Sequence, residues 1–558
     1  MVASFTEIIS IGAVLPFLAT LTEPDKVFQL PIAQPLIRVL NITSSNQLLL
    51  PLTAAFGFAA VLAGVMRLLL LWTSTRLSFA TGADLSYDIY LRTLHQDYEV
   101  HIARNSSIII DGILNKPSIV IYEIVMPILN FISSLIMLVV ILIGLVFVDA
   151  TTAAISFSGF GIIYIVVVLI SRNRLMINSE SIARESSSVI KSLQEGLGGI
   201  RDVLIDGSQK TYLKIFQGSD AQLRRAQGDN AFITAGPRFA IEALGMLLIA
   251  VLAYYLSQQM DGFSKAIPIL GAFALGAQRL FPNLQQVYAS WAKIKGGQAS
   301  LKDALYLLNQ PMPKQVDEFV KPMAFHSAIH LDHLSFRYHA DAPWVLRNIN
   351  LTISKGSRIG FIGTTGCGKS TLLDIVMGLL KPIEGALKVD STTIDAMNRR
   401  AWQANIAHVP QTIFLADSTI AENIAFGVPK DQIDLERVRQ AAAQAQVAQI
   451  IEAWPEQYNS FVGERGVRLS GGQRQRIGIA RALYKKADVI IFDEATSALD
   501  NETEESVIQA IENLRSDITI LIIAHRLTTL RNCTQIIELG NQGVQRTLTY
   551  DQIDLESE

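Results

Sequence analysis

Long apolar stretches constrain this chain most strongly, because about 20 mostly apolar residues are enough for a helix to cross the hydrocarbon layer of a membrane. Six stretches of the 558-residue chain are long and apolar enough. They are residues 4–21, 47–73, 119–148, 151–171, 236–257 and 266–290. A helix satisfies all of its backbone hydrogen bonds within one segment, as a bilayer requires. The N-terminal part is therefore predicted to be an all-α polytopic transmembrane domain of six helices.

The composition agrees with a membrane protein that carries a soluble part. Hydrophobic residues make up 50% of the chain and charged residues only 17%, whereas soluble domains average about 25% charged residues. The net charge of −3 argues against nucleic acid as a partner. The two cysteines, Cys367 and Cys533, lie in the polar C-terminal half. They imply no disulfide framework, which suits a cytosolic location for that half.

The basic residues between the stretches predict their orientation. Connections 74–118 and 172–235 carry four and nine Lys or Arg, whereas 22–46, 149–150 and 258–265 carry two, none and one. Cytoplasmic loops are enriched in Lys and Arg. We therefore expect a multi-pass protein of the cytoplasmic (inner) membrane with both long connections and both termini in the cytosol.

The remaining organisation follows from changes in pattern along the chain. Segments 179–197 and 210–225 look helical, so the long connections are interpreted as membrane helices that extend into the cytosol and turn back. After a polar, proline-rich stretch, short β-branched strands alternate with amphipathic helices, which is typical of an α/β domain. The prediction is a transmembrane domain over 1–308, a linker over 309–324 and an α/β domain over 325–558.

A glycine-rich loop in the α/β domain predicts phosphate binding. It follows a strand expected over 357–362 and precedes an apolar helix expected over 372–380, the context that the phosphate-loop pattern requires. Lys369 would place its charge at the β- and γ-phosphates, and the Ser370 hydroxyl can ligate Mg²⁺. The residues predicted to bind ATP here are Gly363, Thr364, Thr365, Gly366, Cys367, Gly368, Lys369, Ser370 and Thr371.

A second element of nucleotide chemistry is an apolar strand that ends in two carboxylates. Residues 489–492 are apolar, and Asp493 and Glu494 follow them. Asp493 would hold Mg²⁺, directly or through water. Glu494 would face the γ-phosphate and polarise the attacking water.

A third element, between these two, makes the chain resemble a known family. Its sequence is LSGGQ, formed by Leu469, Ser470, Gly471, Gly472 and Gln473. It resembles the signature of ATP-binding-cassette proteins, which binds the γ-phosphate of ATP held by the phosphate loop of the opposite subunit. Two glycines at the start of a helix supply backbone donors for such an anion. The resemblance covers about residues 325–545 and implies an α/β P-loop ATPase domain.

The other elements of that family follow in order, and the resemblance implies a role for each. Tyr338 looks like the aromatic residue that stacks on adenine. Gln411 is similar to the glutamine that senses Mg²⁺ and the membrane domain. Asp500 matches the loop that crosses the dimer interface, and His525 matches the switch histidine that contacts the γ-phosphate. The catalytic residues are therefore expected to be Glu494, Gln411 and His525, with Mg²⁺ held by Ser370, Gln411 and Asp493.

The number of motifs implies a partner. One chain has one phosphate loop and one signature, and each ATP site needs both. No motif is degenerate, so we expect two equivalent sites in a homodimer, or in a dimer with a related half-transporter. Residues 462–466 resemble the exporter-specific loop. Six membrane helices fused ahead of the ATPase look like an exporter half-transporter, whose connection tips, here near 98–108 and 206–216, dock on the ATPases.

The substrate is suggested by charges within the apolar stretches. Arg67, Arg238 and Arg279 are costly in lipid, and an anionic head group would compensate that cost. Alternatively, these arginines pair with Glu7 and Glu242 or extend to the membrane interface.

A looser resemblance favours the anionic head group. Glu7, Arg238, Glu242 and Arg279 lie in patterns similar to those of bacterial flippases of lipid-linked oligosaccharides, and residues 31–40 could form a short helix on the outer surface. The first apolar stretch lacks basic residues before Lys26, which favours a membrane helix over a secretory signal. Its early start suggests a truncated N-terminus.

The resemblances leave two readings of the transported substrate and one of a different class. ATP-driven flipping or export of a lipid-linked oligosaccharide or glycolipid is preferred, and export of drugs, peptides or simple lipids is the alternative. An ATP-gated channel or regulator would normally have a regulatory insert or a degenerate ATP site.

Overall fold

The computed structural model of the 558-residue chain contains two compact units, one formed by Met1–Gln96 with His101–Lys314 and the other by Asp97–Val100 with Gln315–Glu558. The structure describes all residues except 1–5, 7–19, 21–23, 30–33, 40–43, 149, 258–262, 314–319, 495–503, 506–507, 510–515, 525, 541 and 558. The boundaries predicted at 308 and 325 stay a prediction.

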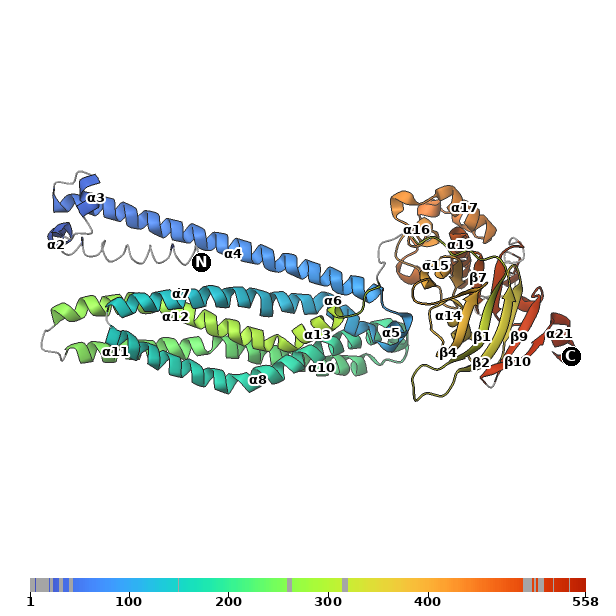
Figure 1. Cartoon of the computed structure of the whole chain (residues 1–558), viewed down its shortest axis with the longest axis horizontal. Coiled ribbons are helices and arrows are strands. Elements are labelled where there is room, and N and C mark those ends of the chain that lie inside the picture. The colour runs from blue at the N-terminus through green and yellow to red at the C-terminus, as the bar shows by residue number, and fades with distance from the viewer. Residues whose placement is uncertain are drawn as a thin grey trace. The chain divides into compact units, whose positions relative to one another are not determined.

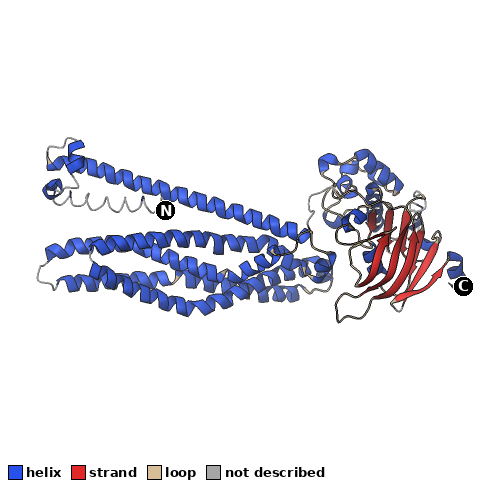
Figure 2. Ribbon diagram, viewed as in Figure 1, coloured by secondary structure: helices blue, strands red, loops and turns tan. Residues whose placement is uncertain are grey.

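The first unit is built from helices, most of them long (Figures 1 and 2). Its elements are α2 (Pro24–Gln29), α3 (Gln34–Val39), η1 (Ser45–Leu48), α4 (Leu49–Leu94), α6 (Ser106–Ile119), the π-helical turn η2 (Val120–Val125), α7 (Met126–Val148), α8 (Ala150–Gly198), α9 (Ile200–Ile205), α10 (Gln209–Ala235), α11 (Pro237–Ser257), α12 (Phe263–Gly296) and α13 (Gln298–Leu308). The short helix α5 (Tyr98–Ala103) is divided between the two units, because Asp97–Val100 belong to the second. In Figure 1, α7, α8, α11 and α12 run side by side.

The lengths of α4 and α8 explain how one helix can serve both the membrane and the cytosol. They contain 46 and 49 residues. At 1.5 Å per residue each spans about 70 Å, more than twice the ~30 Å hydrocarbon layer. The prediction that segments 179–197 and 210–225 are helical is confirmed, because they lie inside α8 and α10, while their extension into the cytosol stays a prediction.

Three helices among the described residues are long and apolar enough to cross a membrane. They cover Leu49–Leu94, Ser106–Ile143 and Gly161–Gly198. The predicted stretches 236–257 and 266–290 coincide with α11 and α12, although the side chains of residues 263–279 and of several residues of α11 lie outside the described part. Apart from Thr6 and Thr20, the predicted first stretch 4–21 also lies outside it. The helical membrane-type fold is thus confirmed, while the count of six stays a prediction.

The cores of the first unit combine apolar side chains with polar groups that are hydrogen-bonded. In one cluster Leu175 and Ala292 are fully buried beside Tyr164, Ile241 and Tyr288. The Tyr288 hydroxyl donates to the backbone oxygen of Ile233 over 3.0 Å. Buried hydroxyls are tolerated when they are hydrogen-bonded, so this contact fixes α12 against the junction of α10 and α11.

The second unit has two sheets with helices around them (Figure 2). The four-stranded antiparallel sheet has the order β2–β1–β4–β5, and the six-stranded sheet has the order β10–β9–β3–β8–β7–β6, parallel except for β10. The strands are β1 (Ala328–Phe336), β2 (Leu346–Ser354), β3 (Arg358–Ile362), β4 (Glu384–Val389), β5 (Thr392–Thr393), β6 (Ile406–Val409), β7 (Val489–Asp493), β8 (Thr519–Ile523), β9 (Gln535–Gly540) and β10 (Gly543–Leu548).

The helices of this unit are mostly short. They are α14 (Lys369–Val376), α15 (Arg399–Gln403), α16 (Ile420–Ile424), η3 (Lys430–Gln432), α17 (Leu435–Gln444), α18 (Ala448–Glu452), η4 (Gln457–Asn459), η5 (Glu464–Gly466), α19 (Gly471–Lys485), η6 (Leu527–Leu530) and α21 (Tyr550–Ser557). The helix expected over 372–380 differs, because it begins at Lys369 and ends at Val376. The chain turns at Gly378, whose φ is +65°.

The parallel strands of the six-stranded sheet are apolar because both of their faces are covered. β8 is buried at every residue, and β7 is buried at every residue except Asp493. Continuous apolar runs are typical of parallel strands covered on both faces. Asp493 lies at the carboxyl end of β7, where open α/β sheets place ligand-binding groups. The sheet therefore presents its polar residues at one edge.

Candidate functional site

The glycine-rich loop between β3 and α14 has backbone angles that most side chains disfavour. Gly363, Gly366 and Gly368 have φ values of +141°, +84° and +100°. A Cβ at Gly368 would lie 2.9 Å from Leu346 Cδ2 and 3.2 Å from the Val345 backbone oxygen. Backbone in this conformation turns successive N–H groups toward a common point, which suits phosphate oxygens.

Lys369 closes the loop on itself. Its ammonium donates to the backbone oxygens of Gly363 over 2.8 Å and Thr364 over 3.1 Å. The residue is 7% exposed, so its charge is kept at the loop. Cys367 lies beside it, with the thiol sulfur 3.9 Å from Nζ. The loop, the lysine and the start of α14 together form a cationic cradle.

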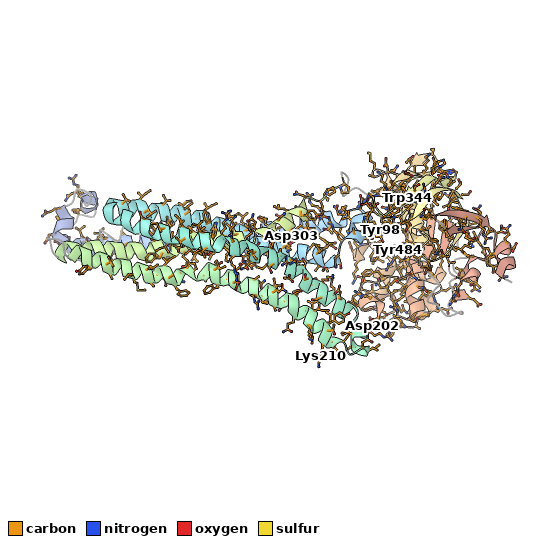
Figure 3. The ribbon with its side chains drawn as sticks, turned by 90° about the horizontal axis from the view of Figure 1, so that it is seen from below. Tyr98, Asp202, Lys210, Asp303, Trp344 and Tyr484 are labelled. Carbon is orange, nitrogen blue, oxygen red and sulfur yellow. The ribbon has the colours of Figure 1, made fainter. Side chains whose placement is uncertain are left out.

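Tyr338 lies next to this cradle, as the adenine role requires. Its hydroxyl is hydrogen-bonded to Thr371 Oγ1 over 3.1 Å, and its ring is partly exposed, edge-on to Phe336. Nearby, the Arg337 guanidinium lies 4.7 Å from the centre of the Trp344 ring, which Figure 3 labels. An exposed aromatic ring beside a phosphate cradle is placed for stacking on a base.

The acidic end of β7 lies beside the same cradle. The Ser370 hydroxyl is hydrogen-bonded to the Asp493 carboxylate. Burial and the neighbouring Glu494 raise the pKa of Asp493, while Ser370 and Lys369 act in the opposite direction. Burial and Asp493 also raise the pKa of Asp374, to about 6. Carboxylates that repel each other in this way are ready to accept a divalent cation.

Asp374 was absent from the predicted site residues. It lies on α14 four residues after Ser370, so both side chains occupy one face of the helix. That i, i+4 spacing from a predicted Mg²⁺ ligand was the signal available in the sequence. Among described residues no group of three or more His, Cys, Asp or Glu is arranged to hold a metal. The oxygen set of Ser370 and Asp493 suits Mg²⁺, which also takes phosphate and water ligands.

Gln411 and Glu494 are brought together by strand order. β6 and β7 are parallel neighbours, and both residues follow the carboxyl ends of these strands. Gln411 Nε2 donates to Glu494 Oε2 over 2.7 Å. Glu494 has a φ of +50°, an uncommon conformation for a residue other than glycine, which turns its carboxylate out of the strand direction.

The predicted signature caps a helix. Ser470 Oγ accepts from the Gln473 backbone N–H over 3.2 Å, and Gln473 Oε1 accepts from the Ser470 N–H over 2.9 Å. This reciprocal capping box fixes the start of α19. A Cβ on Gly471 would meet nothing within 4 Å, so the helix start is open. Within the described part of the chain, no contact recorded for Leu469–Gln473 reaches the phosphate loop.

Four of the remaining site residues are described incompletely or not at all. Asp500 and His525 lie outside the described residues, as does Glu7. Arg279 lies in α12, but its side chain is outside the described part. The roles predicted for these positions stay predictions.

The other two membrane arginines are described. Arg67 is exposed on α4 of the single chain. Arg238 Nε donates to Glu242 Oε1 over 2.7 Å, one turn further along α11. The alternative given for these arginines, pairing with an acid, thus occurs for Arg238.

Known proteins share the sequence of this site. The family model described as ABC transporter matches residues 346–497, which contain the loop, Gln411, the signature, Asp493 and Glu494. An ATP-dependent lipid A-core flippase of Alkalilimnicola ehrlichii is 31% identical over 398 residues, which is 71% of this chain and 67% of that protein. The chain belongs to the ATP-binding-cassette transporter family.

Other relatives agree with the family but cover less of their own length. The lipid A-core flippase of Cupriavidus metallidurans is 32% identical over 62% of this chain and 58% of that protein. The mouse ATP-binding cassette sub-family B member 5 is 36% identical over 51% of this chain and 23% of that protein. The chain therefore spans less than two thirds of the length of several curated relatives.

A solved structure extends the agreement in fold to nearly the whole chain. A bacterial Atm1-family ABC exporter with ATP bound has a TM-score of 0.79 and 22% identity, covering 98% of this chain and 96% of that one. The predicted fold class and exporter resemblance are confirmed. As an ATP-binding-cassette transporter the chain has a nucleotide-binding ATPase domain and is an ATP-hydrolysing membrane transporter.

Proposed function

We propose that this transporter acts as a dimer of half-transporters that hydrolyse ATP to flip a glycolipid across the cytoplasmic membrane. The single observation that carries the ATPase part is the hydrogen bond from Gln411 to Glu494 beside the Lys369 cradle. It joins the proposed water-positioning carboxylate to the proposed phosphate-binding loop in one site. Glycolipid flipping is supported by the lipid A-core flippases among the relatives.

Each described residue has a role that its position supports. Lys369 leaves the loop carbonyls and binds the β- and γ-phosphate oxygens, and Tyr338 stacks on adenine. Glu494 orients the water that attacks the γ-phosphorus, while the bond from phosphorus to the β–γ bridging oxygen breaks. Gln411 holds the Glu494 carboxylate in place. Mg²⁺, when bound by Ser370 and Asp493, neutralises charge on the phosphates.

A dimer is proposed because, among the described residues, the start of α19 makes no contact with the phosphate loop of its own chain. An open, capped helix N-terminus is suited to an anion, and the partner's phosphate loop would bring one. The same logic predicts two equivalent sites, each with a phosphate loop from one copy and a signature from the other. In this proposal the connection tips near 98–108 and 206–216 dock on the ATPase domains.

Mixing two inactive variants tests the composite site. Lys369→Ala lacks a working phosphate loop, and Ser470→Arg lacks a working signature. When the two are co-expressed, the mixed dimer contains one intact site, so activity should return to about a quarter of the native value if dimers form at random. Failure of activity to return, when both variants bind to each other, would contradict the composite site.

The substrate proposal is a glycolipid with an anionic head group, of which a lipid-linked oligosaccharide is the finer choice. Arg67, Arg238 and Arg279 are the candidate head-group contacts, and Arg238 would exchange Glu242 for the substrate. Drugs, peptides or simple lipids are the second candidate. Domain boundaries at 308 and 325, six spans and cytosolic termini complete the proposal.

A panel of substrates in nanodiscs and liposomes decides between these candidates. ATPase stimulation and movement of labelled lipid should be measured with lipid A-core glycolipid, a polyprenyl-pyrophosphate oligosaccharide, phosphatidylethanolamine and a cationic drug. Preference for either glycolipid by at least ~10-fold over the other two supports the proposal. Equal stimulation by all four would refute glycolipid specificity.

A further inference from the structure

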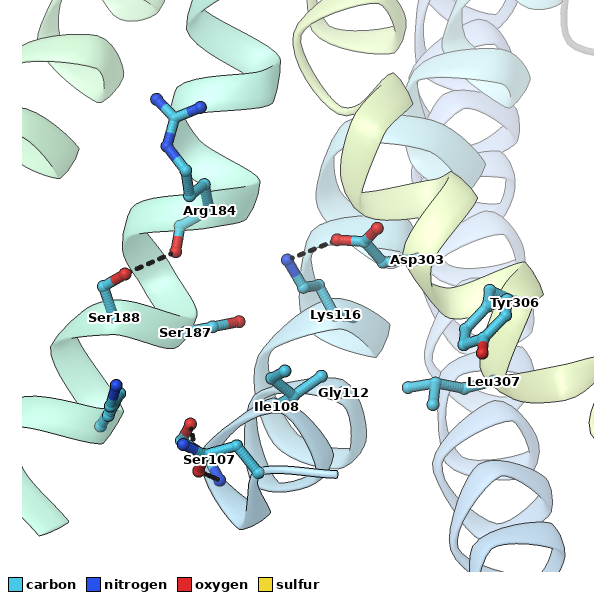
Figure 4. A pocket seen from close by; sticks show the side chains of 12 residues that line it. Ser107, Ile108, Gly112, Lys116, Arg184, Ser187, Ser188, Asp303, Tyr306 and Leu307 are labelled. Atoms are coloured by element: carbon cyan, nitrogen blue, oxygen red, sulfur yellow. Dashed lines mark hydrogen bonds and ion pairs between the residues drawn. The ribbon is translucent and has the colours of Figure 1, made fainter. Parts of the chain in front are cut away.

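A buried charge cluster lies in the helical unit. Lys116 and Asp111 on α6 have side chains that are 3% and 0% exposed, and Asp303 on α13 is half-exposed. Figure 4 shows Lys116 reaching toward Asp303, with Ser187 of α8 nearby. Charges are almost never buried to this extent unless several partners satisfy them.

Asp111 has all of its acceptor positions filled, and half of its donors come from α8. Asn115 Nδ2 of its own helix donates to Oδ1 over 2.8 Å, and Lys116 lies 3.2 Å from Oδ2. From α8, the hydroxyl of Ser186 donates to Oδ1 over 2.6 Å and that of Ser187 to Oδ2 over 2.8 Å. Removal of α8 would leave a buried carboxylate with two of its four bonds.

Lys116 uses each of its three donors on a different helix. The ammonium contacts Asp111 on α6, the backbone oxygen of Ala183 on α8 over 3.0 Å, and Asp303 on α13 over 3.1 Å. An ammonium has no further donors. Lys116 therefore joins α6, α8 and α13 through one ammonium group.

α6 and α13 are also joined without the charges, whereas the cluster is polar wherever it touches α8. A Cβ on Gly112 of α6 would lie 2.2 Å from Leu307 Cδ1, so those two helices approach closely through apolar atoms. The end of α13 is held further by Arg104, whose Nη1 donates to Gln310 Oε1 over 2.7 Å. At the cluster, the bonds to α8 are thus polar ones, which water can replace.

A cavity beside the cluster makes its hydration feasible. It has a volume of about 440 Å³ and is lined by Lys116, Ser187, Asp303 and neighbouring residues. Apolar atoms make up most of its walls, but the polar groups of Lys116, Ser187 and Asp303 and this volume can hold several waters. If α8 moved away, water from the cavity would replace the lost bonds, which makes a hydrated, separated arrangement feasible beside the closed one in the structure.

We infer that Lys116 and Asp111 form a reversible latch between α8 and the α6–α13 pair, and that Lys116 is a positioning residue for transport. The charges hold α8 in the closed arrangement. Because water solvates them readily, they also keep the free energy of separating α8 from α6 and α13 small. Well-packed neutral side chains would favour the closed arrangement, while one unpaired charge would favour the hydrated one. The inference rests on the proposed transport function but not on the identity of the substrate.

Two variants should shift the latch in opposite directions. Lys116→Met leaves Asp111 without its cation and should increase the separated population at least ~10-fold. The double variant Lys116→Met/Asp111→Asn removes both charges and should reduce it by a similar factor. Ser179→Ala is the matched control, because it removes only a neutral bond between α8 and α13, the 3.0 Å contact from the Ala299 N–H.

Spin labels report the two populations directly. Cysteines at Lys191 on α8 and Lys302 on α13 would carry the labels after both native cysteines are replaced by serine, and distances are measured with and without ATP and Mg²⁺. The native cluster should give two distances whose ratio responds to nucleotide. Single and double variants that shift the same way, or not at all, would overturn the latch.

Transport assays complete the test with full-length protein in liposomes. Alternation needs both arrangements, so both variants should lose at least ~10-fold of labelled lipid A-core movement per ATP hydrolysed, while the Ser179→Ala ratio stays near native. A structural role alone would lower yield and leave the ratio unchanged in the protein that folds. If native protein does not move this lipid, the glycolipid proposal fails while the distance measurement still decides the latch.

Discussion

Gln411 and Glu494 are hydrogen-bonded over 2.7 Å although 83 residues separate them in the chain. The bond exists because β6 and β7 are neighbours in the sheet, and it orients the Glu494 carboxylate, whose residue has a backbone φ of +50°. A carboxylate fixed in this way costs little reorganisation when water and phosphate arrive. Two variants test whether the pair functions as we propose.

Glu494→Gln should bind ATP with near-native affinity and hydrolyse it at least ~100-fold more slowly, because a positioned base is lost. Gln411→Ala should retain the base and lose only its orientation, so the decrease should be smaller, about 10-fold. Single-turnover hydrolysis and nucleotide binding measured on the same samples separate the two effects. Near-native turnover by Glu494→Gln would rule out its assignment.

The two thiols should differ sharply in reactivity. Burial raises the pKa of the Cys533 thiol to about 12, so it is almost entirely protonated and unreactive at neutral pH. Cys367 lies in the phosphate loop, 3.9 Å from Lys369. Maleimide should therefore modify Cys367, stop hydrolysis, and be excluded by ATP with Mg²⁺. Mass spectrometry locates the label, and Cys367→Ala is the resistant control. Full turnover after complete labelling of Cys367 would contradict the site.

Asp374 should make the nucleotide-free ATPase domain less stable as the pH rises. Its pKa of about 6 in the folded chain exceeds the ordinary value of about 3.9. A carboxyl group whose pKa is raised by folding stabilises the folded state at pH values below its pKa in the unfolded chain. That contribution is lost as the pH increases through about 6.

The Asp374→Asn variant isolates this contribution. The free energy of unfolding should decrease between pH 4 and 6, and the variant should abolish the part of this decrease that Asp374 causes, about 1–2 kcal/mol. Urea unfolding of both proteins across this range measures it, and ATP with Mg²⁺ should reduce the difference. An identical pH dependence in the two proteins would show that Asp374 is not perturbed.

Neutralising the three membrane arginines should distinguish a structural role from a role in substrate binding. Arg238→Gln leaves Glu242 without the partner that it has in this structure, so a structural pair predicts a lower yield of folded protein. If Arg67 and Arg279 bind an anionic head group, their glutamine variants should lose glycolipid movement while basal ATPase persists. Flipping, ATPase and yield are measured together. Native flipping by all three variants would remove the anionic-cavity proposal, whereas recovery by an Arg238→Gln/Glu242→Gln double variant would assign Arg238 a structural role.

The sequence by itself determined the elements whose signals are local. Apolar runs predicted the helical membrane-type unit, and the strand–loop–helix order around Lys369 predicted the phosphate loop, because hydrophobic length and glycine conformation depend on few neighbours. The family assignment followed from the ordered motifs, and the comparisons agree with it.

Only the tertiary structure decided which distant residues meet. Strand order, which no local pattern encodes, placed Gln411 against Glu494. Helix packing buried Lys116 and Asp111 between α6, α8 and α13, although charged residues in polar connections are expected to be solvated. Asp374 entered the site because the α14 helix turns it toward Asp493. The pairing of Arg238 with Glu242, one turn along the same helix, is local and was already among the alternatives that the sequence offered. Burial and pairing are properties of packed surfaces, so their effects on charge appear only when the helices and strands are assembled.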